Sequence, residues 1–336
     1  MPNRDNGPRD LGASEAGAGI LGTGIPGLGG PYARGMAAGS PFRPAANAPR
    51  SRPVGNVTRG TTGPNRLRRM DRWIAAVHAP ALRRSLPRGP QPGQDRPGWD
   101  RDRPGWDARS PLAVDLGFGA APWTAVELLQ RLRKVRTDVC VAGVEIDPER
   151  VASALPYERD GLTFLHGGFE VPLPGGVRPV LIRAANVLRQ YDEAEVAAVW
   201  ARLCGRLAAP DGLLVDGTCD EIGRRHVWVA LGPEGPRTVT FAARLGSLTA
   251  PSDLAERLPK ALIHRNVPGE PVHAFLRDFD RAWATAAPYG ALSARQRWMT
   301  AARALSGTWP VTGGPHRWRQ GEVTVSWDAL APRGGV

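Results

Sequence analysis

The sequence predicts a doubly wound α/β fold: a mostly parallel seven-stranded sheet with a C-terminal antiparallel hairpin and extra C-terminal helices. Two observations predict it. From residue 112 onward, short apolar runs alternate with segments of helical periodicity. Most of these runs are apolar on both faces, as strands buried in a parallel sheet require. Strands and helices that alternate in this way form a parallel sheet with helices packed on it.

Seven apolar runs are the expected strands. Five of them predict the parallel part of the sheet: LAVDLG (112–117), CVAGVEI (140–146), LTFLHG (162–167), PVLIRAANVL (179–188) and GLLVDGTC (212–219). Two more, HVWVALGP (226–233) and RTVTFAAR (237–244), are joined by a turn-forming Glu-Gly pair and predict the hairpin.

The segments between the strands carry signals for the first residues of helices. Pro122 suits the first turn of a helix, and Asp147 with Pro148 can cap the next one. Asp192 and Glu195 resemble a capping box. Two later stripes at helical spacing predict core-facing helices: Val272, Leu276, Phe279 and Trp283, then Trp298, Ala302 and Leu305.

The N-terminal part differs in composition. Residues 1–66 are rich in Gly, Pro and Arg and poor in large apolar side chains, which predicts a disordered leader. Residues 67–111 predict a short amphipathic helix, carrying Met70, Trp73, Ile74 and Val77, and then a linker in which DRPGWD occurs twice. That repeat is either a stiff spacer or a partner-binding motif built on its tryptophans. The sheet domain is then expected over 112–250, followed by a mainly helical extension over 251–336.

The net charge of +12 belongs mostly to the N-terminal part. Residues 1–66 carry eight Arg against three acidic residues, and residues 67–108 carry nine against five. About +3 remains for the rest, which gives the folded part little electrostatic reason to bind nucleic acid. GAGILG (17–22) matches a nucleotide-binding pattern, but no strand-like run precedes it and no periodic helix follows it.

The cysteines and the hydropathy pattern indicate the compartment. Cys140, Cys204 and Cys219 lack metal-ligand spacing, and an odd number does not suggest a disulfide framework. No run of 18 apolar residues occurs, and the N-terminus lacks the pattern of a signal peptide. We therefore expect a cytoplasmic protein without a metal site and without a membrane span.

The residues at the strand ends are the candidate ligand-binding residues, because open α/β sheets bind ligands at the carboxyl edge. Gly117 and Gly119 allow a tight turn and close approach of a ligand. Asp115, just before them, would repel a pyrophosphate but suits a ligand with ammonium and sulfonium groups. Alternatively, it only hydrogen-bonds the backbone of the turn. Glu145 ends the second strand, where a carboxylate can accept both ribose hydroxyls, and Asp147 is better explained as a helix cap.

This arrangement resembles the class I S-adenosylmethionine-dependent methyltransferases over roughly residues 112–244. Asp115, Gly117 and Gly119 match the glycine-rich first motif of that family, with Ala121 in place of the third glycine. Glu145 matches its second, acidic motif. The resemblance implies S-adenosylmethionine as the cofactor.

The later motifs match the family in part. In HGGFE, Gly168 stands where the family has an acidic residue, which leaves the Phe169 backbone, or Glu170, to meet the adenine. The NVL of the fourth strand is similar to that of several members, including the chemotaxis receptor methyltransferases, and implies that Asn186 lies beside the methionine moiety. The segment LAAPDGLLVDGT matches the usual approach to the fifth strand.

The acceptor side is less well marked. No spacing singles out a catalytic base among the candidates His166, Asp220, Glu221 and His226. Tyr191 either orients an acceptor or packs on the following helix. The polar loop 263–273 is a further candidate, since functional residues often lie on loops held by a rigid scaffold. Its side chains proposed for a wall of the acceptor pocket are His264, Arg265, Asn266 and His273. The alternative, which the composition of the loop favours, is an ordinary connection between helices whose polar residues face water or cap the next helix.

The expected function is S-adenosylmethionine-dependent methyl transfer to a small-molecule acceptor. Two alternatives remain open. A non-catalytic cofactor-binding or regulatory protein would explain the departures at Ala121 and Gly168. A nicotinamide-dependent oxidoreductase would use the same sheet, but Pro122 stands at the third glycine position of its turn. No Asn or Asp followed by Pro-Pro-aromatic occurs, so amino-group methylation of nucleic acid is not favoured.

Overall fold

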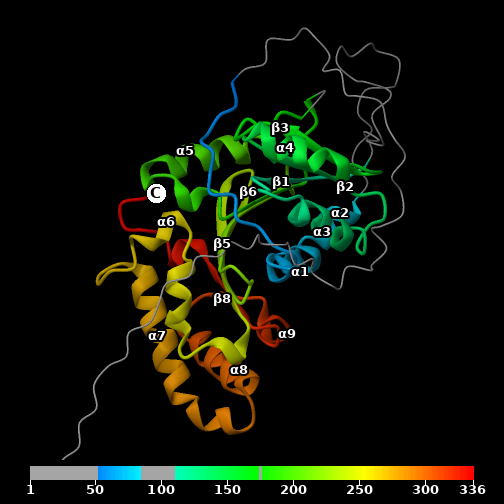
Figure 1. The fold of residues 1–336 in the computed structure, drawn as a ribbon. Helices are drawn as coiled ribbons and strands as arrows, with labels where there is room; N and C mark the ends of the chain where they lie inside the picture. Colours follow the sequence, from blue (N-terminus) through cyan, green and yellow to red (C-terminus); the bar gives the residue numbers. More distant parts are fainter. Residues whose placement is uncertain (1–51, 85–109, 174–175) are drawn as a thin grey trace, which may run out of the picture. The chain divides into compact units, whose positions relative to one another are not determined.

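A computed structural model describes residues 52–84, 110–173 and 176–336 (Figure 1). The GAGILG segment and both copies of DRPGWD lie outside these residues. Within the described part, no helix is long and apolar enough to cross a membrane.

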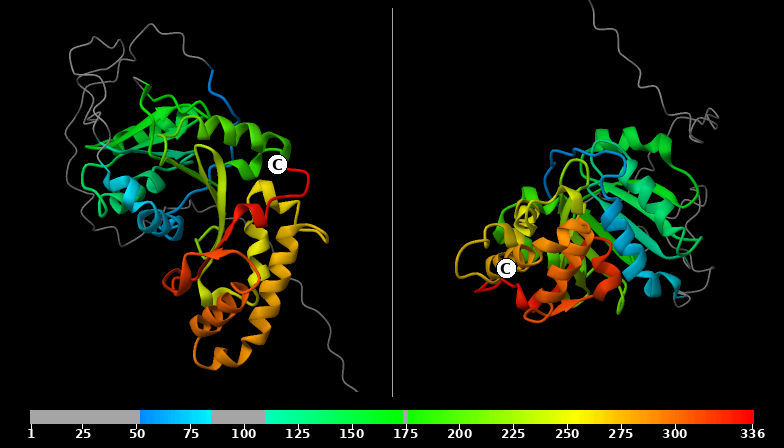
Figure 2. Two further views of the ribbon diagram at one scale, coloured as in Figure 1. Left: turned by 180° about the vertical axis from the view of Figure 1, so that it is seen from behind. Right: turned by 90° about the horizontal axis from the view of Figure 1, so that it is seen from below.

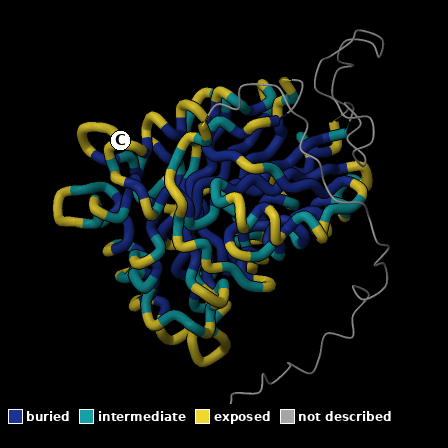
Figure 3. The backbone as a smooth tube through the Cα atoms, turned by 45° about the horizontal axis from the view of Figure 1, so that its top comes forward, coloured by how far each residue is buried: buried dark blue, intermediate teal, exposed yellow. Residues whose placement is uncertain are grey.

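The core of the structure is one sheet with the strand order β3-β2-β1-β4-β5-β6-β7-β9-β8. Its first five strands are parallel and follow the predicted runs: β1 (Leu112–Leu116), β2 (Cys140–Glu145), β3 (Leu162–His166), β4 (Leu181–Ala185) and β5 (Leu213–Cys219). Every residue of β1, β2 and β5 is buried, as the two-sided apolar runs predict. Figure 3 shows that buried residues, in dark blue, gather in the centre of the fold.

The sheet has nine strands rather than the predicted seven. β6 (Arg225–Gly232) and β7 (Gly235–Ala243) form the expected antiparallel hairpin. Two strands that were not predicted, β9 (Glu322–Ser326) and β8 (Val311–Thr312), then pair beyond β7. The C-terminal extension is therefore not only helical. The alternating EVTVS of β9 covers the edge of β7, which would otherwise expose unpaired backbone groups.

Helices pack on both faces of the sheet. On one face, α3 (Trp123–Leu132) and α4 (Pro148–Ala154) share a core with α1 (Arg68–Val77). The opposite core contains α5 (Glu193–Cys204), α6 (Lys260–Ile263), α7 (Pro271–Thr285), α8 (Ala294–Leu305) and α9 (Gly314–Trp318). Asp147 caps α4 as predicted, because its carboxylate accepts the N–H of Glu149 at 2.9 Å.

The C-terminal helices bury the predicted stripes. Val272, Leu276, Phe279 and Trp283 of α7 are buried, and so are Trp298, Ala302 and Leu305 of α8. Figure 2 shows α7 and α8 side by side in both views. Their buried side chains belong to the same core as those of α5.

The predicted amphipathic helix is α1, and the short α2 (Ala79–Arg83) follows it. Met70, Trp73 and Ile74 are buried, and the Trp73 ring contacts Trp228 of β6 at 5.4 Å between centroids. Val77 was expected on the same buried face but is 50% exposed, because it lies in the last turn of the helix.

A buried ionic cluster fastens α1 to the sheet. Arg183 of β4 lies between Asp71 of α1 and Asp115 of β1, and all three side chains are almost completely buried. The Arg183 guanidinium lies 2.8 Å from an Asp115 oxygen, pairs with Asp71, and donates to the Thr124 carbonyl at 2.9 Å. Burial lowers the pKa of Arg183, but the two carboxylates outweigh that effect and raise it.

Residues 52–66 contradict the prediction of a leader without structure. The segment lies against the domain and continues into α1, as the blue trace of Figure 1 shows. Backbone hydrogen bonds hold it rather than apolar side chains, since Val54 and Val57 are 36% and 59% exposed. Composition therefore gave no sign of its placement.

Arg183→Met should lower the free energy of unfolding by about 3–5 kcal/mol, because it leaves the buried Asp115 carboxylate without its cation, whereas Asp71 still pairs with Arg131. Urea denaturation at neutral pH measures the change. Arg84→Met is the matched control, since the Arg84–Asp211 pair is 59% and 42% exposed. It should change the stability by less than about 1 kcal/mol. Equal effects of the two substitutions would contradict the role of the buried cluster.

Candidate functional site

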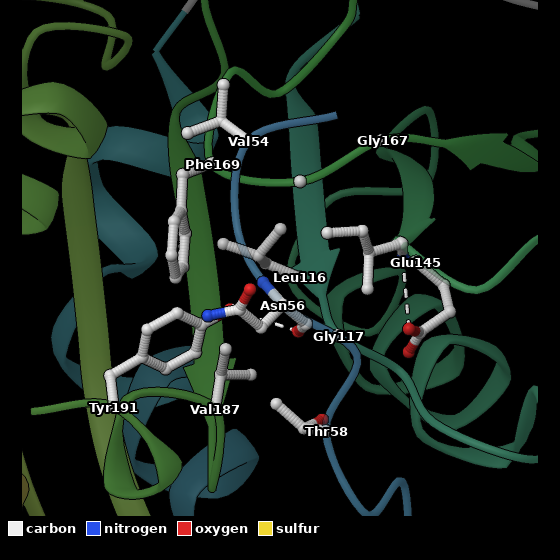
Figure 4. A pocket seen from close by; sticks show the side chains of 12 residues that line it. Val54, Asn56, Thr58, Leu116, Gly117, Glu145, Gly167, Phe169, Val187 and Tyr191 are labelled. Carbon is white, nitrogen blue, oxygen red and sulfur yellow. Dashed lines mark hydrogen bonds between the residues drawn. The ribbon is translucent and has the colours of Figure 1, made fainter. Parts of the chain in front are cut away.

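A small cavity lies at the carboxyl ends of the parallel strands (Figure 4). Four of the seven predicted cofactor-binding residues line it: Gly117, Glu145, Gly168 and Phe169. The other lining residues are Val54, Asn56, Thr58, Leu116, Ile146, Gly167, Val187 and Tyr191. The strand ends therefore meet at one place, as the topology predicts.

The turn after β1 has the backbone that its glycines predict. Gly117 has φ +68° and Gly119 has φ +84°, a region that side chains with a Cβ rarely adopt. The Gly117 N–H donates to the Val144 carbonyl at 2.7 Å. A Cβ on Gly117 would lie 2.6 Å from a Val187 methyl group, so the turn packs closely on the chain that follows β4.

Glu145 presents a fixed carboxylate to this turn. Its side chain is 1% exposed, and its Oε2 accepts the N–H of Gly119 at 2.9 Å. Its Oε1 accepts the N–H of Ile146 at 3.0 Å and lies 3.7 Å from the Arg150 guanidinium. The end of β2 therefore carries a buried, oriented acid, as the sequence predicts.

Asp115 has a different role from the one predicted. One carboxylate oxygen accepts the Thr124 hydroxyl at 2.6 Å, and the carboxylate pairs with Arg183. Burial raises the pKa of Asp115, and the charge of Arg183 opposes that shift. Asp115 lies beneath the turn with its charge balanced and does not line the cavity, so it is not the residue that would attract a cationic ligand.

Asn186 does not line the cavity either. It has φ +62°, and its side-chain oxygen accepts the Cys219 N–H at 2.9 Å. Its amide nitrogen donates to the Cys219 sulfur at 3.2 Å. The side chain thus ties the end of β4 to the end of β5, and its predicted place beside a methionine moiety stays a prediction.

Residues 52–63, called the strap below, cross the site and were missed by sequence reasoning. The Val54 carbonyl accepts the Phe169 N–H at 2.8 Å, and its N–H donates to Glu170 at 2.8 Å. The Tyr191 hydroxyl accepts the Asn56 N–H at 2.6 Å and donates to its carbonyl at 3.0 Å. Figure 4 shows Asn56 between Tyr191 and Glu145.

The second half of the strap reaches the glycine turn. The Thr58 carbonyl accepts the Arg150 guanidinium at 2.9 Å, and the Gly60 carbonyl accepts the Ala120 N–H at 2.8 Å. One sequence signal could have pointed to this contact. Gly168 replaces an acidic residue, and a bare position of this kind indicates close approach of another chain segment.

The candidate bases are dispersed. His166 contacts the Ile146 carbonyl at 3.0 Å, Asp220 accepts the Arg224 N–H at 2.7 Å, and Glu221 is exposed. His226 is fully buried in β6 beside Trp228. Burial, together with Arg69, lowers the pKa of His226 to about 3. A buried ring of this kind cannot reach an acceptor, whereas Tyr191 lines the cavity and binds the strap.

The loop 263–273 lies beside the start of α5. The Arg265 guanidinium contacts Glu193 at 2.5 Å and Glu270 at 3.7 Å. His264 faces Lys260 at 3.5 Å. Because α5 follows the carboxyl end of β4, the loop is near the site edge, but neither Arg265 nor His264 lines the cavity. The acceptor role of His264, Arg265, Asn266 and His273 stays a prediction.

The described part of the chain was also compared with what a metal site or a reactive cysteine requires. It holds no group of three or more His, Cys, Asp or Glu residues suited to a metal ion. Cys140, Cys204 and Cys219 are buried, and burial raises the pKa of the Cys204 thiol to about 11.

No protein-family model matches the chain, and the comparison with curated proteins finds no match. Among solved structures, human N-acetylserotonin methyltransferase with SAM is 25% identical, covers 34% of this chain and 32% of its own, and has a TM-score of 0.26. An O-methyltransferase family 2 protein from Planctomyces limnophilus with apigenin is 19% identical, with coverages of 43% and 37% and a TM-score of 0.27.

A third structure, N,N-8-amino-8-demethyl-D-riboflavin dimethyltransferase from Streptomyces davawensis, is 18% identical, covers 31% of each chain and has a TM-score of 0.26. The chain thus spans about a third of the length of these proteins. Each likeness concerns part of the fold, and its TM-score is too low to indicate a shared function.

The burial of His226 predicts a specific pH dependence of stability. Its pKa is about 3 in the folded chain against 6.5 when exposed, so the unfolded chain takes up the proton first. The stability is intact above pH 6.5 and falls as the pH drops towards 3. Between pH 7 and 5, His226→Leu should lose about 2 kcal/mol less stability than the native chain.

Urea denaturation at the two pH values tests this, with the exposed His316→Leu as the control for replacing a histidine. Parallel pH profiles of the native chain and His226→Leu would contradict the burial argument.

Proposed function

We propose that this chain is an S-adenosylmethionine-dependent methyltransferase that acts on a small-molecule acceptor. One observation carries the proposal: the Gly117–Gly119 turn and the Glu145 carboxylate meet at the carboxyl edge of the sheet. The Gly119 N–H lies 2.9 Å from Glu145 Oε2, and Phe169 lines the same cavity. Glu145 suits ribose hydroxyls, and the Phe169 backbone suits an adenine edge.

The charges around the cavity favour a cationic ligand over a pyrophosphate. A pyrophosphate needs free backbone N–H groups at the glycine turn, but Gly119 donates its N–H to Glu145. Glu145 lines the cavity, and Glu170 accepts the N–H groups of the lining residues Gly168 and Val54. Arg150 pairs with Glu145 and with the neighbouring Asp147. A net negative site attracts sulfonium and ammonium groups and repels phosphates. These acids, rather than Asp115, would attract a cationic cofactor, and they disfavour the pyrophosphate of a nicotinamide cofactor.

The proposed reaction asks little covalent chemistry of the protein. S-Adenosylmethionine supplies an activated methyl group, so the chain needs to align the acceptor and to exclude water. Glu145 and the glycine turn would orient the cofactor. If the acceptor loses a proton, a base must take it up, and no residue of the site is identified as that base.

A non-catalytic binding or regulatory protein is the second candidate. The observation that favours it is the strap, which covers the groups assigned to the cofactor. Turnover separates the two candidates, because only an enzyme transfers radiolabel from S-adenosylmethionine to acceptors in a metabolite extract.

Glu145→Ala should weaken binding of S-adenosylmethionine by about 1–3 kcal/mol, because buried polar groups lose their partner. Isothermal calorimetry measures the affinity. The control is Glu149→Ala, which removes an exposed acid four residues away and should leave the affinity unchanged. Absence of binding both to the native chain and to variants that release the strap would refute the proposed function, and unchanged affinity in Glu145→Ala would refute the role of Glu145.

A further inference from the structure

The strap occupies the groups that the proposed cofactor needs. The Phe169 N–H, expected to meet the adenine, is bound by the Val54 carbonyl at 2.8 Å. The Ala120 N–H of the glycine turn is bound by the Gly60 carbonyl at 2.8 Å. The strap therefore satisfies both ends of the site with its own backbone.

The space left beside the docked strap is small. The cavity volume is about 20 Å³, which holds about one water molecule. Pockets for small molecules measure about 300–1,000 Å³. A cofactor with adenosine and methionine parts cannot enter while the strap is docked.

The contact is close enough to require bare backbone on both sides. A Cβ on Gly168 would lie 2.1 Å from the Val54 carbonyl oxygen, and one on Gly119 would lie 2.5 Å from that of Gly60. On the strap, Gly55 has φ +127°, and its Cβ would lie 2.8 Å from the Tyr191 hydroxyl. The glycine at 168, in place of an acid, therefore has a physical reason: it lets the strap pass.

The contacts of the strap also allow it to dissociate from the site. Its contacts are backbone hydrogen bonds, and its apolar side chains Val54 and Val57 stay partly or largely exposed. Such bonds exchange readily for bonds to water, so their net contribution is modest. A ligand that binds only the open site can then displace the strap.

We propose that the strap and the cofactor compete for one cleft, so that strap docking inhibits the protein and strap release opens it. This proposal rests on the proposed function and adds its regulation. In this case, the apparent affinity for the cofactor depends on the fraction of chains in which the strap is released.

The test compares strap variants of the full chain by calorimetry with S-adenosylhomocysteine. Gly55→Val introduces a side chain at φ +127° against Tyr191, and Gly60→Val does so at φ +65° against Arg150. Gly63→Val is the matched control, because its Cβ would meet nothing within 4 Å. Both strap variants should bind at least about tenfold more tightly than the native chain, and Gly63→Val should bind as the native chain does.

Hydrogen exchange of peptides covering 52–63 gives a second measurement. In the native chain, saturating S-adenosylhomocysteine should speed exchange of the Val54, Asn56 and Arg59 amides, which are bonded in the docked strap. Slower exchange would show a strap that closes over the ligand, and would overturn the competition.

The outcomes separate the two proposals. Equal, measurable affinity of the native chain and both strap variants contradicts the competition alone and leaves the proposed function standing. Absence of binding to all of them contradicts the proposed function, and the competition falls with it. A thermal transition in each variant confirms that it is folded.

Discussion

The fold depends on one buried cation. Arg183 is fully buried between Asp71 and Asp115, and it joins the first helix to the two central strands. The chain before α1 runs along the carboxyl edge of the sheet as the strap, where hydrogen bonds to Phe169 and Tyr191 hold it. The same cluster neutralises Asp115 beneath the glycine turn. The Asp115 carboxylate, which the sequence suggests as a ligand-binding group, therefore helps to hold α1 in place.

The strap gives the site its second constraint. Gly119 and Gly168 lie against the strap, and a Cβ on either residue would clash with the strap backbone. The glycine turn thus serves two partners, since the backbone that admits a cofactor also admits residues 52–63. The acids around the cleft remain suited to a cationic ligand, and the strap, held by main-chain bonds, can give way to one.

Local patterns predicted most of the fold. The two-sided apolar runs indicated β1 to β5, and Asp147 caps its helix as its position before Pro148 suggests. The failures involve contacts between distant residues. Arg183 and Asp115 are 68 positions apart, and no spacing reveals that they pair. The strap lies far from its partners in sequence and buries few apolar side chains, and β9 depends on the free edge of β7.

For the site, the sequence indicated Gly117, Gly119 and Glu145. The contact of Tyr191 with the strap became visible only in the structure.

A crystal structure of the full chain with S-adenosylhomocysteine would show whether the cofactor and the strap share one site. We expect the ribose hydroxyls on Glu145, the adenine against the Phe169 N–H, and the Val54 carbonyl moved away from that N–H. A ligand bound at another place, or one bound at this edge with Val54 and Gly60 still hydrogen-bonded to Phe169 and Ala120, would contradict this expectation.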